Sequence, residues 1–336
     1  MPTRDVVVIA ASAGGLDALQ KTLGGLPATY PGVVFVVSHI PPSASSALAS
    51  ILDRATVLPV AVPTDGEAMV GGSVYVCRPD HHLLLGDGVV LVRRGPKENG
   101  HRPAADPLFR SAARYYGRRA VGVILSGTLS DGTAGLQAIR QQGGTAVVQD
   151  PEDAAYDGMP RSALEEVGAD FVVPADEIGA LLHHLAHQSL DEVPAAVDDT
   201  VAREVALNES DDRVIADDDH PGHPSSWPCP DCNGVLWEVN DGPVLRFRCR
   251  VGHAWIAANL FDEQAVAVEG ALWVALRALE DRAALCHRTA ERAARNHNRY
   301  TAARLEDEGR ELDGSVEILR RMVQPDAEAL DQALHD

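Results

Sequence analysis

An unbroken apolar run near the start of the sequence, followed closely by a glycine pair, restricts the fold more than any other feature. Residues 6–11 are all apolar, as in a strand buried on both faces, and the glycines at 14–15 permit a tight turn. The apolar spacing of residues 16–23 then predicts a helix. Similar apolar runs at 33–37 and 120–125 predict further strands. Strands of this kind alternating with helices predict an α/β fold with an open, doubly wound, mostly parallel sheet.

Three side chains of catalytic type follow these strands. Ser12 comes after the first strand, His39 after the second, and Asp131 just past the third. Ligands of open α/β sheets bind at the carboxyl ends of the strands, so we expect the three to meet there. In such a set the histidine takes the serine proton and the aspartate fixes the imidazole tautomer. The alternative is that Ser12 caps a helix or lies in a phosphate-binding turn, and that Asp131 is a turn residue.

Seven short segments stand in a characteristic order over a little more than half of the chain. They are Ala11-Ser-Ala-Gly-Gly15, Ser38-His-Ile-Pro-Pro42, Asp65-Gly66, His101-Arg-Pro-Ala-Ala-Asp-Pro-Leu-Phe109, Val121-Gly-Val-Ile-Leu-Ser-Gly127, Asp131-Gly132 and Gly158-Met-Pro-Arg161. In this order and at this spacing they resemble the catalytic domain of CheB-type protein-glutamate methylesterases, the chemotaxis enzymes that demethylate receptors.

The resemblance implies that Ser12 is the nucleophile, His39 the base and Asp131 the orienting acid. It implies hydrolysis of γ-glutamyl methyl esters on the cytoplasmic domain of a methylated chemoreceptor, with deamidation of selected glutamines as a related activity. Other proteins of the chemosensory array are further candidate partners, and catalysis needs no cofactor. The backbone amide near Thr128 would lie by the oxyanion. Here the chain departs from the family pattern, because Thr128-Leu-Ser130 replaces Met-Gly-Asn.

Many members of that family carry a receiver domain ahead of the esterase. Ser12 lies so near the start of the sequence that we expect a standalone esterase, without control by phosphorylation in cis. Two other polar residues have open roles. Asp106 is a competing acid or, more simply, a cap for the helix expected from Pro107. Arg102 either faces the cleft and positions an acidic receptor surface or is a solvated loop side chain.

Composition and charge agree with this interpretation. The formal net charge of −20 argues against nucleic acid as the main partner. No apolar run approaches the roughly 20 residues of a membrane span, and no leader pattern precedes the first strand, so we expect a cytoplasmic protein. Between the first strands and residue 120, the segments 71–78 and 88–93 predict a hairpin.

The composition changes after residue 187. Residues 191–219 hold eleven Asp and Glu but only two Arg, with few large apolar side chains. Such a segment buries too little surface to offset its ordering entropy, so we predict an acidic flexible linker over 188–225. A bound helix around residues 201–207 is the weaker alternative.

A pair of cysteine motifs follows the linker. Cys229-Pro-Asp-Cys232 precedes Cys249-Arg-Val-Gly-His253, and the residues between them predict a hairpin. This spacing predicts a zinc ribbon over 226–256 with a structural, four-coordinate site made of Cys229, Cys232, Cys249 and His253. A disulfide is the rival, and it is disfavoured in the cytoplasm. His220 and His223 are the alternatives to His253 as the fourth ligand.

The last part of the chain has helical periodicity. Apolar residues recur at steps of three and four from 257 to about 325, and residues 296–300 interrupt the run, which predicts a helical hairpin over 257–325. Packing within the chain is the simplest role for its apolar stripe, and dimerisation or contact with receptor helices is the alternative.

The sequence therefore predicts an esterase domain at 1–187, the linker, the zinc ribbon and the helical hairpin. Two other functions stay open for the whole chain. One is a serine esterase or amidase that acts on another substrate, and the other is a non-catalytic scaffold of a signalling array. A nucleotide-phosphate turn at Ser12 is weaker, because the full Gly-x-Gly-x-x-Gly pattern is missing.

Overall fold

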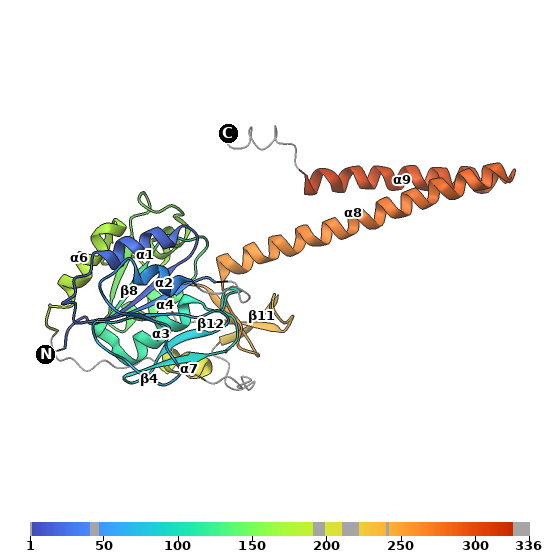
Figure 1. The fold of residues 1–336 in the computed structure, drawn as a ribbon. Coiled ribbons are helices and arrows are strands. Elements are labelled where there is room, and N and C mark those ends of the chain that lie inside the picture. The colour runs from blue at the N-terminus through green and yellow to red at the C-terminus, as the bar shows by residue number, and fades with distance from the viewer. Residues whose placement is uncertain (1, 41–46, 191–198, 210–221, 240–241, 325–336) are drawn as a thin grey trace. The chain divides into compact units, whose positions relative to one another are not determined.

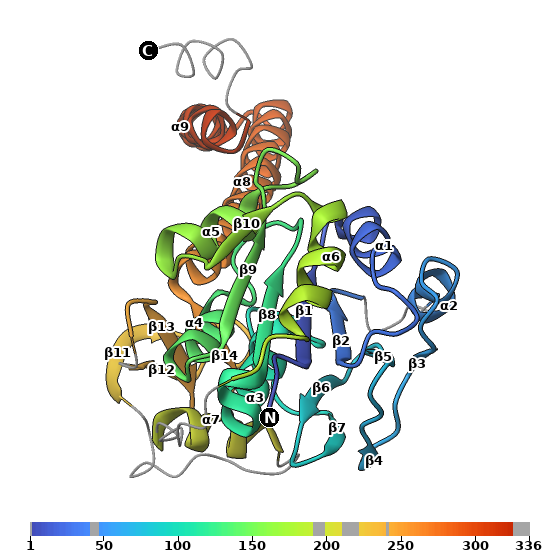
Figure 2. The same cartoon turned by 90° about the vertical axis from the view of Figure 1, so that its left-hand side faces the viewer.

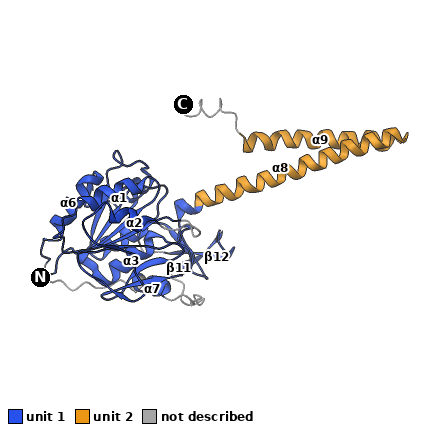
Figure 3. Ribbon diagram, viewed as in Figure 1, with its two compact units in different colours: residues 1–260 blue, residues 261–336 orange. Residues whose placement is uncertain are grey.

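The structure is a computed structural model of the chain. It describes residues 2–40, 47–190, 199–209, 222–239 and 242–324. The chain falls into two compact units, residues 1–260 and residues 261–336 (Figure 3).

A seven-stranded sheet forms the centre of the first unit, in the order β10-β9-β8-β1-β2-β5-β3 (Figure 2). Every neighbouring pair runs parallel. The strands are β1 Val6–Ala11, β2 Val33–Ser38, β3 Val60–Ala61, β5 Val74–Val76, β8 Ala120–Ile124, β9 Thr145–Gln149 and β10 Phe171–Val173. The central strands are apolar and buried, as strands covered on both faces require. The predicted doubly wound sheet is confirmed.

The chain extends this sheet from β1 in two directions. It first adds β2, β3 and β5 on one side, and later adds β8, β9 and β10 on the other. β1 and β8 are therefore neighbours at the point where the strand order reverses. The loops that leave the carboxyl ends of these two strands diverge there, which is where open α/β sheets bind their ligands.

Helices cover both faces of the sheet (Figure 1). Apolar side chains of α1, α2 and α6 join the core on one face, and those of α3, α4 and α5 join the core on the other. The helices are α1 Gly15–Gly24, α2 Leu48–Asp53, α3 Ala105–Tyr116, α4 Thr133–Gln141, α5 Gly158–Glu166 and α6 Ala175–Leu185, with a 3-10 turn, η1, at Gly117–Arg119.

The hairpin predicted from segments 71–78 and 88–93 is wrong. The first of these segments contains β5, which pairs in parallel within the main sheet. The second contains β7 (Val89–Arg93), whose antiparallel neighbours are β6 (His82–Leu85) and β4 (Glu67–Ala68). The residues expected to form the loop carry an apolar run of their own, and this run is buried as β6.

Part of the expected linker is folded. Residues 199–209 form α7 (Asp199–Glu209), which contacts α3, and its Val201 and Val205 belong to the buried core. Glu204 of the same helix is fully buried. The structure therefore differs from a flexible segment at this point and contains the helix that was the weaker alternative. Residues 191–198 and 210–221 of the expected linker lie outside the described residues.

Besides the sheet of β4, β7 and β6, the first unit contains another antiparallel sheet, which we call the C-terminal sheet. Its four strands follow chain order and are β11 Gly222–Pro228, β12 Val235–Val239, β13 Arg246–Cys249 and β14 Ala254–Ile256. Leu236, Phe247 and Trp255 form its small core. A parallel bridge between Glu98 and Ala254 is among the contacts that join β14 to the loop that precedes α3.

The second unit is a helical hairpin, as predicted. α8 spans Ala257–Arg295 and α9 spans Arg299–Val323. Asn298 begins α9 as its N-cap, because its side chain accepts a hydrogen bond from the Thr301 amide. An ion pair of 2.6 Å between Arg320 and Glu280 links the two helices.

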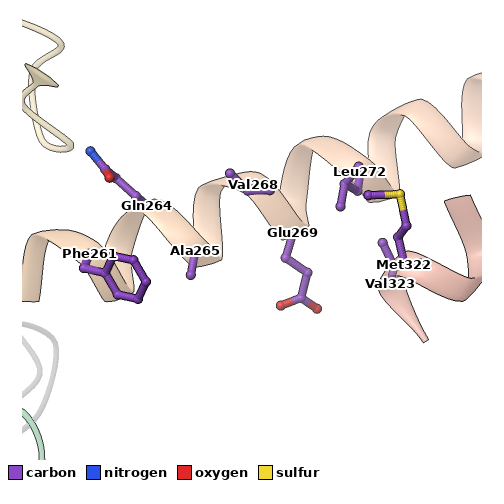
Figure 4. Close-up of a pocket in the computed structure, with 8 residues that line it drawn as sticks. All are labelled: Phe261, Gln264, Ala265, Val268, Glu269, Leu272, Met322 and Val323. Carbon is purple, nitrogen blue, oxygen red and sulfur yellow. The ribbon is translucent and has the colours of Figure 1, made fainter. Parts of the chain in front are cut away.

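An open, mostly apolar groove of about 600 Å³ lies on this hairpin (Figure 4). Its walls are Phe261, Gln264, Ala265, Val268, Glu269, Leu272, Met322 and Val323. Among the described residues, no helix combines the length and the apolar character that a membrane crossing needs.

Candidate active site and metal-binding cluster

Ser12 occupies the sharp turn between β1 and α1. Its amide donates to the Ser126 carbonyl and its carbonyl accepts from the Gly15 amide, so the turn is fixed at both ends. Gly14 has φ +68°, a left-handed conformation that glycine adopts without strain. A side chain at Gly14 would also meet the Ala155 Cβ at 2.7 Å. The glycine pair thus serves to hold Ser12, half-buried, at the end of the strand.

His39 follows β2 and contacts both of its predicted partners. Its Nδ1 lies 2.9 Å from the Ser12 Oγ, and its Nε2 lies 2.8 Å from the Asp131 Oδ2. A carboxylate only accepts, so Nε2 carries the proton and Nδ1 is left as the acceptor for the Ser12 hydroxyl. The three predicted site residues therefore meet in the geometry of a nucleophile, a base and an orienting acid.

Asp131 lies in the loop between β8 and α4 and is only 1 % exposed. Its Oδ2 also accepts the Ala105 amide at 2.7 Å, at the N-terminus of α3. Its Oδ1 accepts the Asn99 side-chain amide at 3.0 Å. Free amides and the positive end of a helix dipole stabilise a carboxylate, so α3 supports the charge that faces His39.

The electrostatics distinguish two neighbouring carboxyls. Burial raises the pKa of Asp131, but hydrogen bonds from His39 and the Ala105 amide outweigh it, and the pKa lies below its ordinary value. Burial and the nearby Asp131 charge raise the pKa of Asp106. When two close carboxyls shift in opposite directions, the one with the lowered pKa carries the charge. Asp131 is thus the ionised partner of His39.

Asp106 has a different role from the one expected. The amides at the start of α3 are served by Asp131, while the Oδ1 of Asp106 accepts the Gly135 amide of α4 at 2.7 Å. Its Oδ2 accepts from Asn99 at 2.9 Å. The simple cap of its own helix is therefore wrong, because the carboxylate already lies inside the first turn of α3 and points to a neighbouring helix.

A cleft of about 220 Å³ opens beside His39. It is lined by His39, Ile40, Lys97, Gly100, His101, Arg102 and Pro103. Arg102 lines the cleft, yet its guanidinium is held by the Asp80 carboxylate at 2.5 Å and the Gly95 carbonyl at 2.7 Å. The solvated loop side chain is therefore wrong: Arg102 faces the cleft, and its contact with an acidic receptor surface stays a prediction.

Sequence reasoning assigned no role to His101 and Asn99. The imidazole of His101 stacks on that of His39, with ring centroids 3.8 Å apart. Burial, and then the charge of His39, lower the pKa of His101 to about 4, so it stays neutral beside the base. For His101 the signal in the sequence was its place at the start of the His101-Arg-Pro segment, and for Asn99 it was the two-residue distance from that segment. The amide of Asn99 itself gave no signal, because an asparagine in an Asn-Gly turn looks like ordinary turn chemistry.

The four predicted metal ligands also come together. Ligand atoms of Cys229, Cys232, Cys249 and His253 all lie within 4.8 Å of one another. The Cys232 and Cys249 sulfurs are 3.6 Å apart, and the Nδ1 of His253 lies 3.5 Å from the Cys249 sulfur. Tetrahedral zinc with bonds of about 2.3 Å to sulfur and about 2.0 Å to nitrogen places such atoms about 3.5–3.8 Å apart.

This geometry argues against the alternatives for the cluster. A disulfide joins its sulfurs at about 2.05 Å, and all five cysteines of the chain are free. His223 lies on β11 outside the cluster, and His220 lies outside the described residues. The donor set of three thiols and one imidazole therefore fits a structural zinc ion.

Known proteins resemble the first half of the chain. Residues 7–182, just over half of the sequence, match the family described as CheB methylesterase. The chain is 40% identical over 186 residues to protein-glutamate methylesterase/protein-glutamine glutaminase 2 of Pseudomonas aeruginosa, covering 54% of this chain and 53% of that protein. It is 41% identical over 181 residues to a protein of the same name from Anaeromyxobacter dehalogenans, again covering 54% and 53%.

A solved structure agrees with these relatives. The catalytic domain of the CheB methylesterase of Thermotoga maritima has a TM-score of 0.52 at 37% identity, and the match covers 54% of this chain and 98% of that one. The chain spans about half the length of the curated relatives it matches. On the family match and the shared fold, the chain belongs to the CheB methylesterase family.

Proposed function

We propose that the protein is a protein-glutamate methylesterase that hydrolyses γ-glutamyl methyl esters on the cytoplasmic domain of a chemoreceptor. The observation that carries the proposal is the hydrogen-bonded series from Ser12 through His39 to Asp131, in a family whose named members have this activity. Its place of action is the cytoplasm, where that receptor domain lies.

The reaction follows from the protonation states of the site. The Ser12 Oγ attacks the ester carbonyl while its proton passes to the Nδ1 of His39. Asp131 stabilises the imidazolium through Nε2. The imidazolium then gives the proton to the departing methoxide, which leaves as methanol, and the γ-glutamyl group stays on Ser12 as an ester. Water attacks this ester with His39 again as the base, and glutamate is released.

The same acyl-enzyme supports glutamine deamidation. A primary amide would give the same ester on Ser12, with ammonia leaving in place of methanol. The relatives in Pseudomonas and Anaeromyxobacter are named for both activities. We therefore propose glutaminase activity on selected receptor glutamines as a second reaction of the same site.

The test is methanol release from a methyl-esterified receptor cytoplasmic fragment. Ser12→Ala should abolish release, whereas Ser50→Ala should not change it, because Ser50 lies exposed on α2 and only bonds the Ala47 carbonyl. Release that persists in Ser12→Ala would refute the assigned nucleophile. Turnover of small esters with none on receptors would favour an esterase for another substrate. An unchanged cellular phenotype in a Ser12→Ala strain would favour a scaffold.

We further propose one structural zinc ion in the C-terminal sheet, held by Cys229, Cys232, Cys249 and His253. Four protein ligands leave no open position, so the metal stabilises the fold and takes no part in hydrolysis. Purified protein should contain one zinc per chain by mass spectrometry of the metal content, and Cys232→Ser should lose it. A full complement of zinc in that variant would refute the ligand set.

A further inference from the structure

The C-terminal sheet reaches the candidate active site through one side chain. Asn99 lies in the loop between β7 and α3, with φ +52°, and is 4 % exposed. Its backbone amide donates to the Ala254 carbonyl at 2.7 Å, and its side-chain Oδ1 accepts the Ile256 amide at 2.9 Å. β14 therefore holds Asn99 at both its backbone and its side chain.

The other end of the same amide group binds the site's carboxyls. Nδ2 donates one hydrogen to the Asp131 Oδ1 at 3.0 Å and the other to the Asp106 Oδ2 at 2.9 Å. Only one orientation of the amide fits, since the carboxyl oxygens accept and the Ile256 amide donates. A flipped amide would place its oxygen against two carboxyls. Because the Ile256 amide donates to Oδ1, the Nδ2 end of the Asn99 side chain is the one that faces Asp131.

The metal-binding cluster lies next to this contact. Cys249 ends β13, and His253 immediately precedes Ala254, the first residue of β14. The Cys249 amide donates to the His253 carbonyl at 2.9 Å, so the two ligands close the turn that sets the start of β14. The ring of Trp255 also lies close to the loop, because a Cβ at Gly100 would meet it at 3.3 Å.

Buried charges fix the sheet against the same loop. Glu98, the residue before Asn99, accepts from Arg110 of α3 at 2.6 Å and from Arg248 of β13 at 3.0 Å. Glu204 of α7 accepts from Arg246 of β13 at 2.7 Å. We call these five residues the buried charge cluster. Each side chain is at most 5% exposed, so these pairs strongly resist separation of the sheet from the loop.

We infer that Asn99 is a positioning residue for Asp131, and that β14, with the turn that Cys249 and His253 close, is the part of the molecule that holds Asn99 in place. The C-terminal sheet is thus a working part of the esterase and not an appended module. This inference rests on the proposed function for the identity of the reaction, but its test can be read without the natural substrate.

The first test compares Asn99→Ala with Val235→Ala in the full, zinc-loaded chain. Val235 is exposed on β12 and serves as the matched control. A fluorophosphonate probe reports the activation of Ser12 directly, because the Oγ–P bond forms as fluoride leaves and the proton passes to His39. We expect Asn99→Ala to slow labelling by about 10–100-fold, as loss of a partner that orients a reacting group does elsewhere. Val235→Ala should stay within about twofold of the native rate.

Two further readouts separate positioning from general damage. Methanol release should show a lower kcat with KM within about twofold, since Asn99 does not line the cleft. The proton NMR signal of the His39 Nε2–H should shift in Asn99→Ala. Labelling within about threefold of the native rate, with that signal unmoved in a folded variant, would overturn the inference.

A measurement on the native sequence covers the case in which Asn99→Ala does not fold. Chelation of zinc should raise hydrogen exchange at the Ile256 amide, shift the His39 signal and slow Ser12 labelling. An unchanged labelling rate and signal in zinc-free protein would also overturn the inference. Failure of the proposed function looks different, because native protein would then release no methanol while Asn99→Ala still slowed labelling.

Discussion

Glu98 offers the sharpest test of how the first unit is held together. Its carboxylate is 1% exposed. Both carboxylate oxygens accept from Arg110 at 2.6 Å. Oε1 also accepts from Arg248 and from Asn208 of α7, each at 3.0 Å. Burial alone would raise the pKa of Glu98, but the Arg110 and Arg248 charges lower it far below its ordinary value, so the group is ionised. Glu98→Gln keeps the shape and removes the charge.

The expected cost follows from what the substitution leaves behind. Three buried guanidinium groups, on Arg110, Arg246 and Arg248, would then share the buried carboxylate of Glu204 without the charge of Glu98. Breaking a buried ion pair by removing one partner typically costs about 3–5 kcal/mol, because the remaining charge stays desolvated. We expect Glu98→Gln to lower the free energy of unfolding of the first unit by that amount, which is a midpoint shift of about 1–2 M in urea.

Urea denaturation followed by tryptophan fluorescence measures this in a Trp273→Phe background. The three remaining tryptophans then all lie in the first unit. Glu165→Gln, on the exposed surface of α5, is the control and should change stability by less than about 0.5 kcal/mol. Adding Arg248→Met to Glu98→Gln should recover part of the loss. A loss no larger than that of the control, or additive effects in the double variant, would refute the reasoning.

Gly127→Ala should reduce methanol release by at least about tenfold, because a Cβ there would overlap the Met159 side chain, which must move, and would lie 2.9 Å from the Ser12 Cβ, which displaces the nucleophile. His101 has a pKa of about 4 in the fold against about 6.5 unfolded, so the unfolded chain binds more protons between these values and stability falls as pH drops through that window. The loss should be about 2–3 kcal/mol, and urea midpoints of His101→Gln should lack it. A chain shortened to residues 1–190 holds no tryptophan, so its unfolding is followed by far-UV circular dichroism; it should unfold at lower urea than the native chain, since Glu98 loses its partners on α7 and β13.

The strand ends could be predicted because their signals are local. An apolar run, a glycine pair and a helical spacing sit within twenty residues around Ser12, and the structure forms that strand, turn and helix. His39 and Asp131 were placed by the same logic, since parallel strands bring their carboxyl ends to one edge. The cysteine spacing likewise predicted which four side chains would meet. In each case the signal for each strand end or cysteine motif is carried by residues close together in sequence, and general rules of sheet and zinc-site geometry bring the pieces together.

Other features depend on partners far away in sequence. The segment that contains Glu204 has the composition of a linker, and nothing in it shows that three arginines at 110, 246 and 248 neutralise that carboxylate when it is buried. Asn99 looks like a turn residue, because its partners Asp131 and Ile256 lie 32 and 157 residues away. The composition of a segment indicates that burying its charged groups is costly. It does not show which distant ion pairs and hydrogen bonds offset that cost.

The range that matches the family therefore differs from the range that folds as a unit. The match ends at residue 182, yet Glu98 and Arg110 inside it find buried partners on α7 and β13 outside it. A chain cut at residue 182 would leave the charges of Glu98 and Arg110 without these partners. It would also remove the hydrogen bonds that β14 makes to Asn99. A rate change in such a fragment would combine the loss of Asp131 positioning with every other effect of removing the residues beyond 182. The role of residues beyond 182 is therefore better tested by single substitutions at Asn99 and Glu98 than by truncation.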